Sequence, residues 1–584
     1  MIKVENLSYS YPQKDLYKNV SFTIEDDVHC ALIGSNGTGK STFLDMLIHE
    51  DDYLYDGKIS IQDIDKIGYV SQFSSMAQKT VQTVYEYISE EFVKLEQQIA
   101  DYCKEMETAT ELEDIFEAYQ TVLDQFDSID GNSYDSNIKK QLKAAGLEKL
   151  EQQSLNELSG GEFKLIQVIR EMMLSPKFLI MDEPDVFLDF HHLDALKNLI
   201  NTHKGTLLVI THSRYLLNHC FNKILHMENM DIQEFNGSYI EYNYELLSTK
   251  IDLEEAAAAD QAEIDRQSKI VDKARARATI MDNASLGKTV HARQTLLDRL
   301  KARKTKAPFV DIKQPKIYFE SGEEVTEDYI LELTDYSVAF DEQLLEHISF
   351  HITPGDHVGI FGRNGTGKTT MLHEIFQNTK DSIHLSKAAE MNLFCQITDS
   401  LYDNSKTLFE IMEKKGLEKK EEAITYLAQY GFYEESLSQS AGKLSGGEKD
   451  LFQLAVIALE KANFLLLDEP TGHLDLYAQI ALEEAIREYK GTVLMVSHDF
   501  YTVAGCVDYV LFVEDNTIRK MSNRKFRQMI YTNHFDKNYL LLEQEKKELE
   551  TKIQQLLQKN EFEKAKILME PLAELIKKIK TVIK

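Results

Sequence analysis

One series of short motifs occurs twice in this chain of 584 residues, in the same order. A glycine-rich loop that ends in Gly-Lys-Ser or Gly-Lys-Thr is followed by Leu-Ser-Gly-Gly-Glu, by Asp-Glu-Pro after an apolar run, and by a histidine after another apolar run. The paired motifs are Gly34–Ser41 and Gly362–Thr369, Leu158–Glu162 and Leu444–Glu448, Asp182–Pro184 and Asp468–Pro470, and His212 and His498. Four motifs repeated in register predict two copies of one domain in a single polypeptide.

The spacing between the copies locates an insertion. Gln72 and Gln396 lie 324 residues apart, whereas Ser159 and Ser445 lie 286 residues apart. Because the offset shrinks by 38 residues between these points, the first copy must hold 38 extra residues between Gln72 and Ser159. Aromatic and aliphatic residues at core-like spacing, among many acidic residues, predict a helical arm there at about residues 86–131.

The segment after the first copy has the composition of long helices. Residues 243–306 contain few Gly or Pro and many Ala, Glu, Lys, Arg and Gln. We expect one helix from Tyr244 to about Met281, a break at 283–288, and a second helix over about 290–304. At 1.5 Å per residue the first helix extends about 50 Å, so its tip is expected to project beyond the folded domains.

These patterns predict an α/β chain with two phosphate-binding-loop domains, a long helical-hairpin linker between them, the short helical arm, and a C-terminal helical extension. Near the C-terminus, Leu and Ile alternate with Glu and Lys and the pattern breaks near Lys559, which predicts a small helical hairpin or coiled coil. The expected boundaries are 1–242 for the first domain, 243–325 for the linker, 326–535 for the second domain and 536–584 for the C-terminal hairpin.

Composition excludes several classes of protein. The apolar content of 43% is ample for buried cores, yet no uninterrupted apolar run approaches the ~18–20 residues of a membrane helix. The N-terminal residues do not form a signal-peptide pattern. The cysteines lie far apart without a Cys-x-x-Cys pair, so we assign no zinc or iron–sulfur site. We therefore expect a cytoplasmic protein, which cannot move anything across a membrane by itself.

Charge is distributed unevenly along the linker. The net charge of the chain is −32, but residues 269–306 carry eleven basic residues against three acidic ones, and residues 251–265 carry six acidic residues and no Lys or Arg. A cationic tip on a long helix suits RNA phosphates; a solvated surface helix is the alternative. The bases expected to contact RNA are Lys288, Arg293, Arg299, Lys301 and Arg303.

Each glycine-rich loop follows an apolar strand pattern and precedes a helical pattern, which is the context of a phosphate-binding loop. Backbone N–H groups and the helix N-terminus surround the phosphates in such a loop. We expect Lys40 and Lys368 to neutralise phosphate charge. The hydroxyls of Ser41 and Thr369 are then expected to coordinate Mg²⁺.

Two further acidic pairs follow from the buried strands. Asp182 and Asp468 end strongly apolar runs, where a carboxylate is costly unless it serves a bound cation, so we expect them on the Mg²⁺ side of the sites. The adjacent Glu183 and Glu469 are then placed to orient or deprotonate the attacking water.

Six more side chains recur in register and are expected near the nucleotide. A single Gln, His or strand aromatic is more often an ordinary residue, but its repetition at the same place in both copies favours a function. Gln72 and Gln396 would sense Mg²⁺ and the γ-phosphate, His212 and His498 would contact the γ-phosphate, and Tyr11 and Phe340 would stack on adenine.

The order of these motifs, and above all Leu-Ser-Gly-Gly-Glu, resembles the ABC ATPase family over nearly the whole of both copies. The resemblance implies a head-to-tail sandwich in which Ser159 caps the ATP held by Lys368 and Ser445 caps the ATP held by Lys40. The residues it places at ATP are Tyr11, Gly34, Asn36, Gly37, Gly39, Lys40, Ser41, Thr42, Gln72, Ser159, Gly160, Gly161, Phe340, Gly362, Asn364, Gly365, Gly367, Lys368, Thr369, Thr370, Gln396, Ser445, Gly446 and Gly447.

Tandem ABC domains joined by a long helical hairpin resemble the ABC-F family in particular. The resemblance implies an ATPase that binds at the ribosomal E site and inserts the tip of its linker towards P-site tRNA and the peptidyl-transferase centre. It implies partners in rRNA and tRNA rather than DNA, and a monomer whose ATPase sandwich is intramolecular. Two roles stay open, protection from ribosome-targeting antibiotics and a housekeeping role in translation. The ATPase subunit of a membrane importer is a rival from another class, which the basic linker disfavours.

The two copies differ just after the glutamate. Asp185-Val186-Phe187 of the first copy stands where the second has Thr471-Gly472-His473. Both glutamates and the following aspartates, Asp189 and Asp475, are retained, so we expect two competent sites with unequal rates. Neutral drift is the alternative. The departure resembles some antibiotic-resistance members, which favours that role slightly.

Overall fold

The structure is a computed structural model that describes residues 1–584 except 12–13, 62–66, 73–80, 109–111, 187, 282–293, 296–313, 341–342, 396–401, 535–538 and 584. The chain forms two compact units. The first comprises Met1–Asn236 and Gln314–Arg527, and the second comprises Gly237–Lys313 and Gln528–Lys584. Within the described residues, no helix is both long enough and apolar enough to cross a membrane.

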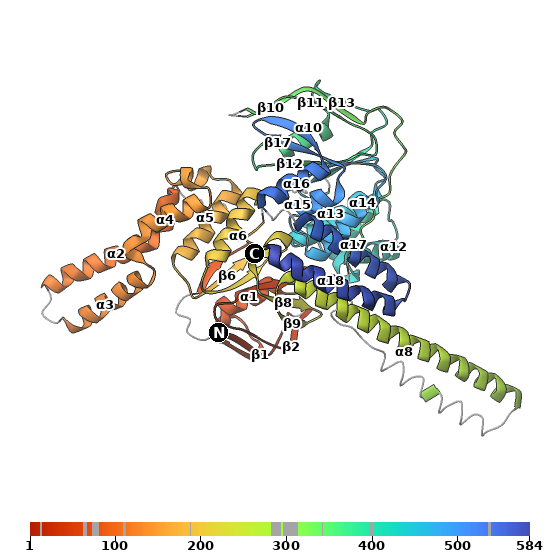
Figure 1. The fold of residues 1–584 in the computed structure, drawn as a ribbon, viewed down its shortest axis with the longest axis horizontal. Helices are drawn as coiled ribbons and strands as arrows, with labels where there is room; N and C mark the ends of the chain where they lie inside the picture. Colours follow the sequence, from red (N-terminus) through yellow and green to blue (C-terminus); the bar gives the residue numbers. More distant parts are fainter. Residues whose placement is uncertain are drawn as a thin grey trace. The chain divides into compact units, whose positions relative to one another are not determined.

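The first unit contains both copies of the repeated domain, as the sequence predicts (Figure 1). Each copy has a three-stranded antiparallel sheet and a six-stranded, mostly parallel sheet. The strand orders are β2-β1-β4 and β5-β6-β7-β3-β8-β9 in the first copy, and β11-β10-β13 and β14-β15-β16-β12-β17-β18 in the second. Strand for strand the two large sheets have the same order, which confirms the duplicated α/β fold.

The elements of the first copy are β1 (Ile2–Tyr11), β2 (Lys14–Ile24), β3 (His29–Ile33), α1 (Lys40–Ile48), β4 (Asp56–Ile61), β5 (Ile67–Val70), α2 (Val84–Thr108), α3 (Glu113–Ser128), α4 (Tyr134–Ala144), α5 (Gly160–Met173), β6 (Phe178–Asp182), α6 (Phe190–Thr202), β7 (Thr206–Ile210), α7 (Arg214–Cys220), β8 (Lys223–Glu228) and β9 (Asp231–Asn236). Those of the second are β10 (Leu331–Ala339), β11 (Gln343–Ile352), β12 (His357–Gly362), α10 (Lys368–Gln377), β13 (Ile383–Leu385), β14 (Met391–Phe394), α11 (Leu408–Lys414), α12 (Lys420–Leu427), α13 (Gly446–Leu459), β15 (Phe464–Asp468), α14 (Leu476–Glu488), β16 (Thr492–Val496), α15 (Phe500–Cys506), β17 (Tyr509–Glu514), β18 (Thr517–Ser522) and α16 (Asn523–His534).

The central parallel strands are short, continuous apolar runs. Every residue of β6, β7, β15 and β16 is buried, as expected for strands covered on both faces. Each copy has its own core of buried residues, which includes the central strands and the helix after the glycine-rich loop. A buried sheet of this kind presents the carboxyl ends of its strands at one edge, where ligands bind in open α/β folds.

The insertion in the first copy consists of α2 and α3, which pack against each other as an antiparallel pair (Figure 1). Its base is anchored in the domain because Ile88, Phe92 and Leu95 of α2 are buried, and Phe92 stacks on Tyr134 of α4 with ring centroids 4.9 Å apart. Residues near the far end are open to solvent, including Phe116, which is 55% exposed.

The second unit is built on α8 (Tyr239–Met281), with α17 (Tyr539–Gln558) and α18 (Phe562–Ile583). The long helix begins at Tyr239, five residues earlier than Tyr244 as the sequence analysis placed it. Ser238 explains the difference: its backbone N–H donates to the carboxylate of Glu241 at 2.9 Å, and its hydroxyl caps the new helix. The Ser-x-x-Glu signal was present in the sequence.

The C-terminal helix α18 packs against the long helix α8, and α17 packs against α18 (Figure 1). Lys566 of α18 pairs with Asp252 at 3.0 Å and also with Glu255, and Lys580 pairs with Glu241 at 2.7 Å. The C-terminal hairpin therefore covers part of the acidic stretch of α8. The expected break at 283–288, the second linker helix, and the bases Lys288, Arg293, Arg299, Lys301 and Arg303 lie outside the described residues.

Candidate nucleotide sites

The two glycine-rich loops have the geometry of phosphate-binding loops. Their glycines Gly37, Gly39, Gly365 and Gly367 have φ of 75°, 100°, 76° and 86°, which side chains with a Cβ rarely adopt. A Cβ on Gly34 would also lie 2.1 Å from the carbonyl oxygen of Met227. Glycine is thus required at these positions by the backbone.

Both loop lysines are buried and fold back over their own loops. Lys40 is 6% exposed and donates to the carbonyls of Gly34 at 2.8 Å and Ser35 at 3.0 Å. Lys368 is 5% exposed and donates to the carbonyl of Arg363. Burial lowers the pKa of both lysines, and nearby carboxylates offset part of this effect. Each ammonium group is therefore held where phosphate oxygens would partner it.

The helices that follow the loops begin directly at the loop lysines. α1 starts at Lys40 and α10 at Lys368, and neither helix has a side-chain cap at its N-terminus. Uncapped N–H groups and the positive end of the helix dipole favour an anion. The loops thus fit the triphosphate of a nucleotide.

The next residues after the lysines face the buried aspartates. Thr369 Oγ1 donates to Asp468 Oδ1 at 3.0 Å, and the Ser41 hydroxyl donates to the carboxylate of Asp182. Burial raises the pKa of both aspartates, that of Asp182 to about 6. Among the described residues, Asp182 Oδ1 is buried without a hydrogen-bond partner. A hydroxyl beside a buried carboxylate is a ligand set that fits Mg²⁺.

The two glutamates after these aspartates are held in the left-handed region, with φ of 46° for Glu183 and 48° for Glu469. This conformation costs about 1–3 kcal/mol for a residue with a Cβ, and such strain clusters at functional sites. Each glutamate N–H donates to the carbonyl that ends the neighbouring strand, Ile210 or Val496, at 2.9 Å. The strands therefore fix the two carboxylates at the edge of each sheet.

Polar side chains converge on the glutamates. Gln72 donates to the Glu183 carboxylate, and His212 Nε2 lies 3.9 Å from Glu183 Oε1. In the second copy His498 Nε2 lies 3.3 Å from Glu469 Oε1. Burial raises the pKa of Glu469 to about 8 and lowers that of His498 to about 3, so a neutral imidazole faces the carboxyl group. Gln396, the expected counterpart of Gln72, lies outside the described residues.

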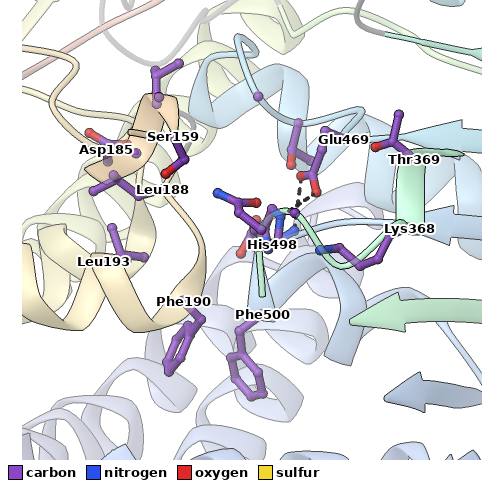
Figure 2. Close-up of a pocket in the computed structure, with 18 of the residues that line it drawn as sticks. Ser159, Asp185, Leu188, Phe190, Leu193, Lys368, Thr369, Glu469, His498 and Phe500 are labelled. Carbon is purple, nitrogen blue, oxygen red and sulfur yellow. Dashed lines mark hydrogen bonds and ion pairs between the residues drawn. The ribbon is translucent and has the colours of Figure 1, made fainter. Parts of the chain in front are cut away.

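One cavity of about 650 Å³ joins the two copies (Figure 2). The second copy lines it with Lys368, Thr369 and Glu469, and the first copy lines it with Ser159 and Gly160. The structure thus brings the Leu-Ser-Gly-Gly-Glu motif of the first copy to the glycine-rich loop of the second, in the pairing that the sequence analysis expects. Thr370, Asn364, Gly365, Gly367, Gly161, His498 and Phe340 also line it.

The glycine-rich loop of the first copy makes direct contacts with the second copy. The backbone N–H of Asn36 donates to Asp475 Oδ2 at 2.8 Å, and its side-chain amide donates to the carbonyl of His473 at 3.0 Å. A Cβ on Gly447 would lie only 1.9 Å from Asn36 Nδ2. At the equivalent position of the second copy, the backbone N–H of Asn364 donates to Asp189 Oδ2 at 3.0 Å. Each glycine-rich loop is therefore held by the aspartate of the other copy.

Ser159 and Ser445 are the N-cap residues of α5 and α13. Each hydroxyl accepts from the N–H of the glutamate three residues on, Glu162 or Glu448, and each glutamate carboxylate accepts from the serine N–H. The serines thus fix where each helix starts, which points the first turn of the helix at the opposite copy. Gly446 and Gly447 lie in that turn of α13.

The two aromatic residues expected at adenine are exposed rather than buried. Tyr11, at the end of β1, is 45% exposed and lies edge-on to Tyr9 with ring centroids 5.4 Å apart. Phe340 follows β10, is 70% exposed and lines the cavity with Lys368. Thr42, in the first turn of α1, is partly exposed. An exposed aromatic ring beside a phosphate loop is available to stack on a base.

The copies differ by a pair of buried residues that the sequence analysis missed. Lys164 of α5 is buried and donates to the carbonyl of Gln72 at 3.2 Å and to that of Ser71. Burial lowers its pKa to about 8. The offset of 286 places Asp450 at the same point of α13, and burial raises the pKa of this carboxyl to about 7. Comparison of the two copies at that offset would have found the exchange.

The exchange of Lys164 for Asp450 occurs together with a second difference between the copies. Asp185 stands where the second copy has Thr471. Asp185 is half-buried in the cavity wall, and within the described residues its Oδ1 has no hydrogen-bond partner. Burial raises its pKa to about 7, and the charge of Glu183 adds to the effect. Lys164 and Asp185 in one copy thus replace Asp450 and Thr471 in the other, so the departure is part of a wider change of buried charge. Phe187 lies outside the described residues.

We expect Asp185→Asn to stabilise the nucleotide-free protein more at pH 8 than at pH 5. The pKa of this carboxyl is about 7 in the folded chain and lies near 4 in an unfolded one, so the wild type loses stability as the pH rises through this window. The extra gain at pH 8 should be about 2 kcal/mol, measured by chemical denaturation at both pH values. Asp194→Asn, at a carboxylate paired with Lys197, is the control. An equal gain for Asp185→Asn at both pH values would contradict the assignment.

Comparison with known proteins decides the family. The model of the ABC transporter family matches residues 17–186 and 345–472, the two segments that hold the glycine-rich loops and the buried acidic residues. The chain belongs to the ABC transporter family. Its ABC domains bind ATP, and the tandem chain is of the ABC-F kind that the sequence predicts.

Similar proteins span most of the ABC chain. It is 27% identical to "Uncharacterized ABC transporter ATP-binding protein YfmM" of Bacillus subtilis, over 86% of this chain and 96% of the relative. It is 28% identical to "Putative ATP-binding protein YdiF" of the same species, over 89% and 81%, and 27% identical to "Probable ATP-binding protein YheS" of Escherichia coli K12, over 89% and 79%.

A solved structure shares the tandem ABC fold. The structure named "RNase-L Inhibitor" matches with a TM-score of 0.55 at 17% identity, over 91% of this chain and 93% of the other. A complex of the archaeal ribosomal stalk protein aP1 with the archaeal ribosome recycling factor aABCE1 matches with a TM-score of 0.54 at 16% identity, over 91% and 93%. At these identities the match concerns the fold alone.

Proposed function

We propose that this ABC protein is a Mg²⁺-dependent ATPase that binds the ribosome when its two domains are closed on ATP. The ATPase part of the proposal rests on the reciprocal pairing of the two copies. Asp189 and Asp475 each bind the glycine-rich loop of the opposite copy. With this pairing, a nucleotide at either loop is enclosed by residues from both copies.

The residues around the cavity have complementary roles in hydrolysis. Lys368 and the first turn of α10 bind the phosphates, and Ser159 closes the site from the other copy. Mg²⁺, when bound at Thr369 and Asp468, supplies positive charge next to the phosphate oxygens. Glu469 is positioned to orient a water and, in its ionised form, to accept the proton of that water, and the neutral His498 at 3.3 Å is available to donate to the phosphate. Lys40, Ser41, Asp182, Glu183 and His212 have the same roles in the first site.

The ribosomal half of the proposal rests on the linker. Of the eleven bases in residues 269–306, four lie in the last part of the long helix α8 and the others follow it in sequence, in a chain whose net charge is −32. Such a segregated cationic segment suits rRNA and tRNA phosphates. We propose the E site as the docking place, with the linker tip near P-site tRNA and the peptidyl-transferase centre. Protection from antibiotics or relief of stalling would follow, with a housekeeping role in translation as the alternative, and the cytoplasm as the location.

The test uses the double variant Glu183→Gln, Glu469→Gln, which is intended to bind ATP without turnover. We expect this variant to co-sediment with ribosomes in MgATP and to lose that association when Lys288, Arg293, Arg299, Lys301 and Arg303 are changed to Gln. Five lost phosphate contacts should weaken binding by roughly 100-fold or more at moderate salt, and the salt dependence should flatten.

A matched control removes the same amount of charge elsewhere. Five exposed lysines of the second ATPase domain serve this purpose: Lys419, Lys420, Lys443, Lys461 and Lys490. Changing these to Gln should leave the association within a few-fold of the unmodified variant. If ATP is trapped and the ribosome is still not bound, the ribosomal role is wrong and the ATPase role stands.

A further inference from the structure

Arg214 lies at an unusual position for a charged residue. It follows His212 by two residues and opens α7, at the contact between the two ATPase copies. The offset of 286 places Phe500 at the same point of the second copy. We call the segments that carry His212 and His498 the histidine loops. The histidine loop of the first copy is therefore followed by an arginine, and that of the second copy by a phenylalanine.

Among the residues that the structure describes, the partners of Arg214 belong to the second copy. Its Nη2 donates to Asp499 Oδ2 at 2.8 Å and Thr502 Oγ1 at 3.2 Å, and it also pairs with Glu483. The guanidinium carbon lies 5.0 Å from the centre of the Tyr501 ring. One side chain of the first copy thus binds two carboxylates, a hydroxyl and an aromatic ring, which come from α14, from α15 and from the N-cap residue of α15.

The two carboxylates need this cation. The side chain of Glu483 is 6% exposed, and Thr502 Oγ1 lies within 2.9 Å of Glu483 Oε1 and 2.8 Å of Asp499 Oδ2. Burial alone would raise the pKa of Asp499, but the Arg214 guanidinium holds it below its usual range. Without the arginine, two negative charges would remain close together in a poorly solvated contact, which strongly disfavours their present arrangement.

In the part of the chain that the structure describes, the equivalent half of the contact has no ion pair between the copies, since Lys197 pairs with Asp194 of its own copy. Ser213 stands in place of Asp499, and Lys197 stands in place of Glu483. Phe500 packs instead against Phe190, with ring centroids 6.3 Å apart. The contact between the copies is therefore ionic on one side and aromatic on the other, although the two ATPase domains are repeats.

We propose that Arg214 is a positioning residue through which the first ATPase copy sets the histidine loop of the second site. Asp499 directly follows His498, whose Nε2 faces Glu469 at 3.3 Å. Docking of the first copy supplies the cation that Asp499 and Glu483 require, so the loop that carries His498 takes its working position only when the copies are closed. Phe500 gives no reciprocal cation to the first site. The first copy therefore positions the histidine loop of the second site, but the second copy does not position that of the first site in this way. The inference rests on the proposed ATPase function.

A site-resolved turnover assay tests the direction of this control. In a Glu183→Gln background only the second site is intended to turn over, and in a Glu469→Gln background only the first. In the Glu183→Gln background we expect Arg214→Met to lower kcat about tenfold, as for loss of a charged hydrogen bond. In the Glu469→Gln background we expect it to lower kcat less than about twofold. Arg214→Lys should restore part of the rate. Equal losses in both backgrounds would mean that Arg214 only holds the interface, and would overturn the proposal.

A second measurement does not depend on hydrolysis. Amide hydrogen exchange in MgATP should become about tenfold faster over residues 497–502 in Arg214→Met, and stay unchanged over residues 211–216. The control is Arg170→Met, because Arg170 pairs with Glu90 at 3.1 Å and lies 4.4 Å from the Tyr87 ring within the first copy. Unchanged exchange over residues 497–502 would overturn the inference. A wild type without turnover but with the expected exchange would refute the proposed ATPase function alone.

Discussion

Replacement of Glu183 and Glu469 together by glutamine is expected to lower ATP turnover by at least about 100-fold, the usual contribution of a positioned general base. Glutamine keeps the size of the side chain but cannot accept the proton of the attacking water. The loop lysines and the opposite copy remain in place, so ATP binding should persist. Phosphate release measures the first effect, and retention of labelled ATP on the purified protein measures the second.

The control for this double variant is a glutamate with similar surroundings and no place at the cavity. Glu171 of α5 is half-buried, and burial raises its pKa as it does for the two site glutamates. Glu171→Gln should leave turnover within about twofold, as for a neutral surface change. Turnover that persists in the double variant would mean that another group takes the proton, and His212 or His498 would be the first candidates.

Much of the fold could be predicted because it depends on local patterns that occur twice. The glycine-rich loops, the apolar runs before Asp182 and Asp468, and the offset of 286 between the copies are all visible in the chain. A family resemblance then gave the pairing of Ser159 with Lys368. The structure places both in the lining of one cavity, Lys368 from the second copy and Ser159 from the first.

Contacts between the copies were harder to predict because they join residues several hundred positions apart. Arg214 and Asp499 are 285 residues apart in sequence, and no motif near Arg214 predicts its partner. A basic residue at the start of a helix is usually solvated, so the pattern favoured no role. The exchange of Lys164 for Asp450 was overlooked for another reason: each residue is ordinary alone, and only the comparison of the two repeats reveals a change of buried charge.

The same reciprocal contacts decide how the two ATP sites depend on each other. Asp475 holds the loop of Lys40, and Asp189 holds the loop of Lys368. If the sites were independent, removing one lysine would leave the turnover of the other site. In a sandwich, loss of ATP at one loop also removes the closed state that the other site requires. The glutamate variants differ in this respect because they keep ATP bound.

We therefore expect Lys40→Met or Lys368→Met alone to reduce total ATP turnover by more than about tenfold rather than by half. Lys223→Met is the matched control, because Lys223 is also buried, at 2% exposure, but pairs with Glu25 at 2.9 Å within the first copy. Lys223→Met should leave turnover per folded molecule unchanged, even where it lowers stability, because Lys223 does not line the cavity. Retention of about half the activity in both loop variants would contradict the sandwich and indicate two independent ATPases, whereas a steep loss in each would establish that neither site works without the other.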